Sequence, residues 1–370
     1  MPREFSPDRT AGLLLGLACG DALGAGYEFG PTLDESVPVH MIGGGIGDFE
    51  PGEWTDDTAM ALCITRALAT GGDFLTEAGL NAVADNFHDW IDSHPKDIGV
   101  QTRNVLSLAP SRSAADLTRV AHERFERYPD HSAGNGSLMR TAAVALGCFD
   151  DDARLAEATR AVNDLTHPDP VCAEACVLWT LACAHAVRHG NFDGVHRSLD
   201  HLPPDRAAWW RDRLLEAESR PAESFVRNAW VVEALQTAWS VIARTPVPDD
   251  RPTDHFKLAT EAAVRVGNDT DTVAAIAGSL LGARWGLSAT RRAGSRNSTV
   301  RRASGHTIWR SLRSVPVRRR LPGLLRTDPD GLRNVDNLSC LRHLPFWNPT
   351  TQGARIGPLH SRPAHLRHAI

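Results

Sequence analysis

The chain has 370 residues, of which 42% are hydrophobic and 23% charged, a composition typical of a globular protein with one large core or two smaller ones. It excludes collagen, long disordered chains and small disulfide-rich scaffolds. The formal net charge is −5, but residues 291–370 contain 16 Arg, no Lys and three acids. This segment therefore carries about +13, and residues 1–290 carry about −18.

The N-terminal residues, MPREFSPDRT, lack the apolar core of a signal peptide, and no stretch reaches the roughly 18 uninterrupted apolar residues of a membrane span. We therefore expect a cytoplasmic protein without membrane contact. The seven cysteines are odd in number and lie in apolar, helix-like patterns, which indicates reduced core thiols rather than disulfides. Cys172, Cys176 and Cys183 share one helical face without a CxxC pair, so we do not expect a structural zinc site.

Apolar residues recur at helical spacing along most of the chain, first with Leu13, Leu14 and Leu17 after Asp8. In chain order, the clearest predicted helices are 56–70, 77–92, 137–147, 153–163, 169–189, 223–243, 255–265 and 270–286. Segments rich in Gly, Pro and Asp, such as those before residue 56 and after residue 244, predict loops. Alternating strand patterns are scarce and no period of 20–50 residues repeats. Residues 1–290 are therefore predicted to form a single compact all-α domain.

The sequence changes character near residue 290. Residues 291–370 are rich in Arg, Pro and Ser and show little helical patterning. We expect a domain boundary at this point, followed by a disordered basic tail. Two alternatives are a changed reading frame and a basic extension that contacts nucleic acid or an acidic partner.

Two clusters of oxygen-bearing side chains stand at the starts of predicted helices. Each cluster alone is also typical of a helix N-cap. Together they offer four carboxylates and two hydroxyls without His or Cys, a hard donor set suited to Mg²⁺ or Mn²⁺ rather than zinc. Without cations the carboxylates would repel one another, and a pair of ions would suit hydrolysis. The candidate metal ligands are Thr55, Asp56, Asp57, Asp269, Asp271 and Thr272.

A Gly-rich turn leads into the predicted helix at 137–147. Backbone N–H groups in such a turn can hold a phosphate or diphosphate, although a plain Asn-Gly loop has the same pattern. No Gly-Lys-Ser/Thr follows, and the glycines at 43–47 miss the GxGxxG spacing, which argues against nucleoside triphosphate and dinucleotide redox sites. The candidate substrate-binding residues here are Gly134, Asn135, Gly136, Ser137, Met139 and Arg140.

Six short motifs, taken in order, resemble those of the ADP-ribosylglycohydrolase family. They are GLACGDALG at 16–24 followed by Glu28, GEWTDDT at 52–58, Asp97-Ile98-Gly99, GNGSLMR at 134–140, Thr166-His167 and GNDTDT at 267–272. The resemblance implies an all-α fold around a two-metal site. It also implies hydrolysis of the glycosidic bond between ADP-ribose and a protein side chain, with arginine as the expected acceptor.

The resemblance also implies roles for individual residues. The six oxygen ligands would hold two Mg²⁺ or Mn²⁺ ions, with Asp57 and Asp271 part of the catalytic machinery. Glu28 or Asp97 would act as general base or stabilise oxocarbenium character. The 134–140 amides would hold the diphosphate and His167 the distal part of ADP-ribose.

Two other functions remain open from the sequence. One is a catalytically silent homologue that binds ADP-ribose or serves a structural role, and the other is a metal-dependent phosphohydrolase on a different helical scaffold. The implied partner is an ADP-ribosylated protein or a small molecule containing ADP-ribose. Beyond Gly286 the family usually continues with a Trp-containing helix, whereas this chain continues with LSATRRAGSRNSTVRR.

Overall fold

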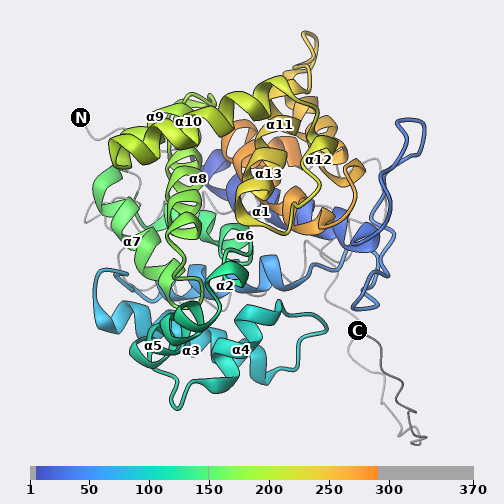
Figure 1. Cartoon of the computed structure of the whole chain (residues 1–370). Helices are drawn as coiled ribbons and strands as arrows, with labels where there is room; N and C mark the ends of the chain where they lie inside the picture. Colours follow the sequence, from blue (N-terminus) through green and yellow to red (C-terminus); the bar gives the residue numbers. More distant parts are fainter. Residues whose placement is uncertain (1–5, 149, 291–370) are drawn as a thin grey trace, which may run out of the picture. The chain divides into compact units, whose positions relative to one another are not determined.

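The computed structural model describes residues 6–148 and 150–290 (Figure 1). The chain divides into two units, residues 1–321 and 322–370, and every described residue belongs to the first. The predicted boundary near residue 290 and the basic segment 291–370 lie outside the described residues.

Helices account for nearly all secondary structure in the described ranges, where strand pairing is limited to isolated bridges. The α-helices are α1 (Pro7–Gly24), α2 (Asp56–Ala69), α3 (Glu77–Asp92), α4 (Val100–Leu108), α5 (Ala114–Arg127), α6 (Leu138–Thr141), α7 (Asp152–Asp164), α8 (Pro170–His189), α9 (Gly194–Arg197), α10 (Pro204–Ser219), α11 (Val231–Arg244), α12 (His255–Arg265) and α13 (Thr270–Trp285). Short 3-10 helices cover η1 (Ala25–Tyr27), η2 (Pro129–His131), η3 (Ala142–Gly147), η4 (Ser198–His201), η5 (Ala222–Ser224) and η6 (Pro252–Asp254). The all-α prediction is confirmed.

Two of the predicted helices differ from the structure by more than one residue at an end. The predicted helix 137–147 is the single turn α6 followed by the 3-10 helix η3. The predicted helix 223–243 was wrong at its start, because α11 begins only at Val231. Residues 225–230, between η5 and α11, form a loop in which Asn228 hydrogen-bonds to the backbone before α13 instead of continuing the helix.

Helix α8 is the centre of the core. By length and composition alone it could span a membrane, but 78% of its apolar 18-residue window is buried inside the fold. It packs against α7, α11 and α13, which indicates a core helix. Cys172, Cys176 and Cys183 are buried along it, and all six cysteines among the described residues are free, as predicted.

The first and last described α-helices lie side by side, in backbone contact (Figure 1). On α1, glycines recur every four residues and face α13. A Cβ on Gly16 would lie 2.2 Å from the carbonyl oxygen of Gly278, and one on Gly20 would lie 1.9 Å from that of Ala274. Only glycine allows two helices to approach so closely. This contact sets the C-terminal end of α1 against the N-terminal end of α13.

Candidate metal centre and active site

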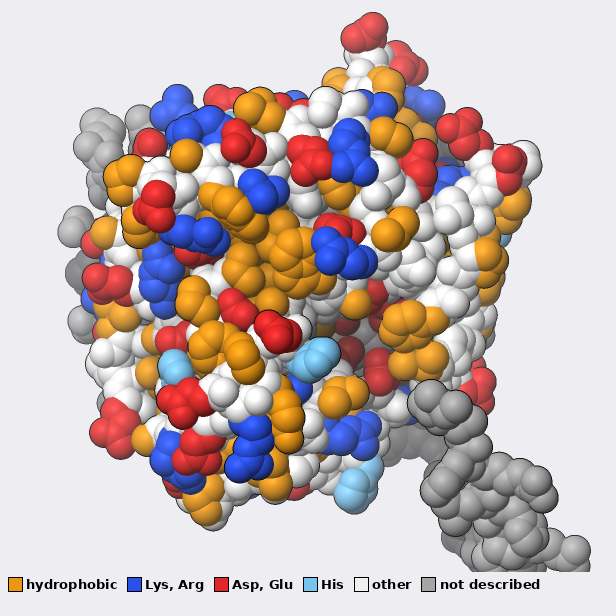
Figure 2. Space-filling model, in the orientation of Figure 1, with side chains coloured by type: hydrophobic (Ala, Val, Ile, Leu, Met, Phe, Trp, Pro, Cys, Tyr) orange, Lys and Arg blue, Asp and Glu red, His pale blue; other side chains and the backbone are white. Residues whose placement is uncertain are grey.

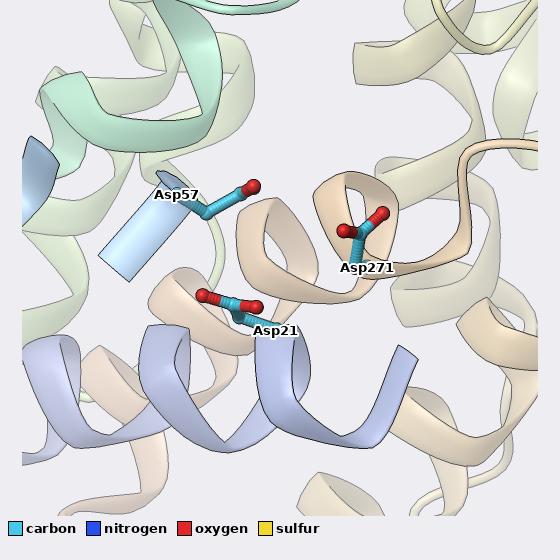
Figure 3. A group of neighbouring side chains, drawn as sticks. All are labelled: Asp21, Asp57 and Asp271. Carbon is cyan, nitrogen blue, oxygen red and sulfur yellow. The ribbon is translucent and has the colours of Figure 1, made fainter. Parts of the chain in front are cut away.

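Three carboxylates from three helices converge at one point (Figure 3). Asp21 comes from the last turns of α1, Asp57 from the first turn of α2 and Asp271 from the first turn of α13. One oxygen from each lies within 4.8 Å of the others, and all three side chains are buried. Close packing of α1 on α13 brings residues 21 and 271 together from opposite ends of the described chain.

A second carboxylate group shares one member with the first. Oxygens of Glu28, Asp269 and Asp271 also lie within 4.8 Å of one another. Glu28 follows the 3-10 helix η1 and is half-buried, whereas Asp269 immediately precedes α13 and is buried. Asp271 therefore stands between two adjoining acidic groups.

The N-cap residues of α2 and α13 are Thr55 and Asp269, and neither side chain caps its own helix. Thr55 makes no side-chain capping bond, and its hydroxyl donates to Asp57 Oδ2 at 3.1 Å. Asp269 likewise makes no capping bond, and its Oδ2 accepts from Asn135 Nδ2 at 2.8 Å. The N-cap alternative therefore does not account for these residues, since the side chains turn toward the acidic groups.

Asp21 is a site residue that the candidate ligand set from sequence omitted. Its carboxylate accepts from the backbone N–H groups of Thr55, at 2.9 Å, and Thr58, at 3.0 Å, and from the Thr58 hydroxyl at 2.5 Å. It thus caps α2 from another helix and orients the first turn that carries Asp57. The motif around Asp21 was visible in the sequence, but its contact with α2 depends on tertiary packing.

The electrostatics of these acids favour a positive charge beside them. Burial raises the pKa of Asp21 to about 6 and that of Asp56 to about 7. Burial, followed by repulsion from neighbouring carboxylates, raises the pKa of Glu28 to about 8 and those of Asp57 and Asp271 well above the usual range. None of these acids forms an ion pair with a Lys, Arg or His of the described ranges.

The donor set fits a divalent cation. All donors are oxygens, and two carboxylate oxygens, Asp57 Oδ1 and Glu28 Oε2, are buried without a hydrogen-bond partner. Unpaired buried carboxylate oxygens are costly unless a cation or proton neutralises them. Hard oxygen donors favour Mg²⁺, Ca²⁺ or Mn²⁺ over softer metals. The acidic groups can therefore hold metal, as the sequence predicted.

These raised pKa values predict an unusual pH dependence of stability. In the metal-free protein the folded state binds more protons than the unfolded chain between about pH 4 and 8, so we expect the melting temperature to fall as pH rises across that range. Saturating Mg²⁺ or Mn²⁺ should remove most of this fall, with about 2.7 kcal/mol gained per site at 100 times its Kd. Calorimetry across this pH range, with EDTA and with saturating metal, measures the melting temperature in each case. A melting temperature that rises with pH in EDTA would contradict this prediction.

The loop before α4 approaches the same centre. The N–H of Gly99 donates to Asp56 Oδ2 at 3.3 Å, which ties this loop to the first turn of α2. Asp97 is half-exposed, accepts from the N–H of Ile98 at 2.7 Å and raises the pKa of Glu28 by repulsion. The structure thus places the two candidate bases, Glu28 and Asp97, at one site.

The Gly-rich loop is joined to the acidic groups through amide side chains. Asn135 Nδ2 donates to Asp269 Oδ2 and to the carbonyl of Asn228, at 2.8 and 3.0 Å. Asn228 in turn donates to the carbonyl of Gly267 at 3.0 Å and accepts from the N–H of Asp269 at 3.2 Å. Sequence reasoning missed Asn228; its only signal was an Asn, a poor helix former, inside a predicted helix.

The remaining candidate substrate-binding residues fall into two classes. Gly134 and Gly136 lie beside His167, whose Nε2 is 3.0 Å from the position of a Cβ on Gly136. The other three have buried side chains beneath the loop; they are Ser137, Met139 and Arg140. The loop thus lies directly over the buried His167 ring, and Ser137, also buried, accepts from the Cys176 thiol at 3.4 Å.

His167 is held by a chain of hydrogen bonds. Its Nδ1 lies 2.7 Å from the Thr166 hydroxyl, which accepts from Arg140 Nη2 at 2.5 Å. Arg140 is fully buried, with Nη1 3.1 Å from Met60 Sδ and its guanidinium 4.8 Å from the centre of the Phe87 ring. Its side chain therefore lies behind His167 rather than at the loop surface.

The acid centre is an internal feature of the protein. On the face shown in Figure 2, Lys and Arg side chains are interspersed with Asp and Glu. Surface acids such as Asp116 and Glu123 pair with Arg119 on the same helix. The buried acids of the centre have no such neighbours in the described part of the chain, which sets them apart from an ordinary solvated acidic surface.

Comparison with known proteins agrees with this geometry. The family model described as ADP-ribosylglycohydrolase matches residues 2–298. The chain belongs to the ADP-ribosylglycohydrolase family. The motifs that suggested this family are the ones that supply the acidic groups, the Gly-rich loop and His167.

Several relatives of the family have curated names. The chain is 29% identical to the ADP-ribosyl-dinitrogen reductase glycohydrolase of Rhodospirillum rubrum, over 76% of this chain and 86% of the relative. It is 30% identical to the ADP-ribosylarginine hydrolase Tri1 of Pseudomonas putida, over 77% of this chain and 72% of the relative. A solved ADP-ribosylglycohydrolase-related protein complex matches with a TM-score of 0.60 and 27% identity, covering 84% of this chain and 96% of the matched chain. The family assignment and fold are thereby confirmed.

Proposed function

We propose that this protein is a metal-dependent hydrolase that cleaves the glycosidic bond between ADP-ribose and a protein side chain, with arginine as the acceptor. The observation that carries the proposal is the pair of buried carboxylate groups sharing Asp271, beside the Gly-rich loop and His167, in a chain of this family. Relatives named as ADP-ribosylarginine hydrolases support arginine as the acceptor.

We propose two Mg²⁺ or Mn²⁺ ions, one at each carboxylate group. Asp21, Asp57 and Asp271 would hold one ion, and Glu28, Asp269 and Asp271 the other, with Asp56 and the hydroxyls of Thr55 and Thr272 as further ligands. When bound, the ions supply polarisation of the ribose oxygens and neutralise the acids. The Glu28–Asp269–Asp271 group adjoins Asn135 through Asp269, so the ribose would lie between this group and the Gly-rich loop.

Different residues of the chain then have different roles in hydrolysis. The loop at 134–137 and His167 bind the diphosphate end and so place the anomeric carbon near the carboxylates. Glu28, with one unpartnered oxygen, is the favoured base. It takes a proton from the attacking water as the water oxygen bonds to the anomeric carbon and the carbon–nitrogen bond breaks, and it then gives that proton to the guanidine that leaves. Asp97 stabilises the positive charge that develops on the ribose.

The test is release of free ADP-ribose from an arginine-ADP-ribosylated protein by the full-length chain, with Mg²⁺, Mn²⁺ or EDTA. We expect release with metal, none with EDTA, and no inorganic phosphate. A serine-linked substrate run in parallel measures acceptor preference, and faster release from serine would contradict the arginine assignment. Phosphate release would favour the phosphohydrolase alternative, and ADP-ribose binding without release from either substrate would favour the silent homologue.

A further inference from the structure

The neighbours of His167 determine which of its ring nitrogens carries the proton. Arg140 remains protonated at neutral pH, because burial lowers its pKa only to about 10, and a guanidinium can only donate hydrogen bonds. The Thr166 hydroxyl oxygen, 2.5 Å from Arg140 Nη2, must therefore be the acceptor in that contact. Its single proton remains free to donate to another group.

Among the described residues, the acceptor within reach of that hydroxyl proton is His167 Nδ1, at 2.7 Å. Thr166 is fully buried, so a proton on Nδ1 would leave the threonine hydroxyl without an acceptor, which is unfavourable for a buried polar group. Burial and the nearby guanidinium of Arg140 hold the pKa of His167 well below its usual range, so the ring is neutral. A neutral ring with Nδ1 as acceptor carries its proton on Nε2.

The Nε2 atom points toward the Gly-rich loop. It lies beside Gly136, at 3.0 Å from the position that a Cβ would take, and has no hydrogen-bond partner within the described ranges. The His167 backbone is fixed as well, since its carbonyl accepts from Asn163 Nδ2 at 2.7 Å and its N–H donates to the Asn163 carbonyl at 2.9 Å. The ring, which is only 2% exposed, therefore directs an N–H donor to a fixed place beside Gly136 of the loop.

We propose that Arg140 is a positioning residue that acts through Thr166 to hold His167 as the Nε2–H tautomer, which donates to an anionic oxygen of the ligand. This inference rests on the proposed function for the identity of that ligand, a nucleoside diphosphate sugar. It changes the role of Arg140 from a substrate-binding residue to one behind the binding surface. The fixed Nε2–H group also makes the site selective for ligands that carry a hydrogen-bond acceptor at this position, because this N–H can donate a hydrogen bond to the ligand but cannot accept one.

The direct test is the tautomer itself, read from long-range ¹⁵N–¹H spectra of the full-length protein with labelled histidine, the His167 signal being assigned from its loss in His167→Gln. In the wild type we expect a protonated Nε2 and an unprotonated Nδ1. Thr166→Val, which keeps the side-chain shape but removes the hydroxyl, should abolish the preference, and Thr166→Ser should restore it. A wild-type proton on Nδ1 would overturn the inference without any variant.

Affinity for ADP-ribose provides a second readout, by calorimetry in the presence of Mg²⁺. We expect Thr166→Val to raise the Kd about 10- to 100-fold, as for loss of a hydrogen bond to a charged group, and Thr166→Ser to stay near wild type. Thr159→Val is the matched control, because that buried hydroxyl donates only to the Leu155 carbonyl in its own helix α7. Equal affinity in Thr166→Val and Thr159→Val would refute the relay. Absence of ADP-ribose binding by the wild type would refute the proposed function instead, while the spectra would still decide the tautomer.

Discussion

Asp271→Asn should lower the rate of ADP-ribose release by at least about 10³-fold, because it removes the carboxylate that both acidic groups share and that would contact both proposed ions. Cations at such sites contribute several kcal/mol to transition-state stabilisation, and each 1.36 kcal/mol is a factor of ten in rate. The loss should appear in kcat as well as in the metal concentration that gives half-maximal rate. Single-turnover release across a Mg²⁺ titration measures both.

The same substitution should act in the opposite direction on stability. In EDTA at pH 8, Asp271→Asn removes a buried carboxylate that its neighbours repel, so we expect a higher melting temperature than that of the wild type. Asp212→Asn on the exposed face of α10 is the control, and it should change neither the rate of ADP-ribose release nor the melting temperature. A variant that loses both activity and metal-free stability would show that Asp271 is a structural residue.

Gly20→Ala should destabilise the protein by about 3 kcal/mol or more, although alanine is the better helix former by about 1 kcal/mol. The new Cβ would lie 1.9 Å from the carbonyl oxygen of Ala274. Because this neighbour is a backbone atom, the clash can be relieved only by moving α1 away from α13. The expected fall in melting temperature is roughly 6–12 °C. Metal affinity should fall too, because the same displacement moves Asp21 away from Asp271.

Gly99→Ala is the matched control for the helix contact. Gly99 has a negative φ of −56°, and a Cβ there would meet no atom within 4 Å. Its melting temperature should therefore stay near the wild-type value. If Gly20→Ala also melts at the wild-type temperature, the close approach of the two helices does not limit stability.

The parts of the fold that the sequence predicted well depend on local pattern. The helices at 77–92 and 255–265 were predicted with their observed bounds, because their apolar spacing and end signals agree. The helix at 223–243 was misplaced because the Asn228 side chain bonds to residues about 40 positions later in the chain. No local pattern contains that partner.

In the candidate site too, the features set by local sequence were predicted, and those set by tertiary contacts were not. Both Thr/Asp clusters were identified from composition and motif order, and the structure brings them together. Asp21 was omitted from the ligand set because its role comes from contact between α1 and α2, and Arg140 was placed at the binding surface because a motif does not show which way a side chain points. The sequence contains a glycine at every fourth position of α1, but the need for glycine there comes from the close approach of the α13 backbone, which the sequence does not show.

The pairing of α1 with α13 also has a consequence for biosynthesis. Asp21 and Asp271 are separated by 250 positions, so no local segment of the chain contains the whole group of acids. At a translation rate of 5–20 residues per second, about 12–50 s pass between synthesis of the first ligand and of the last. Throughout that interval the first helix lacks α13, the helix with which it makes its most extensive contact, and the acidic groups are incomplete. Ribosome-bound chains ending before residue 270 should therefore stay protease-sensitive whatever the Mg²⁺ concentration, and resistance should arise only after α13 has emerged.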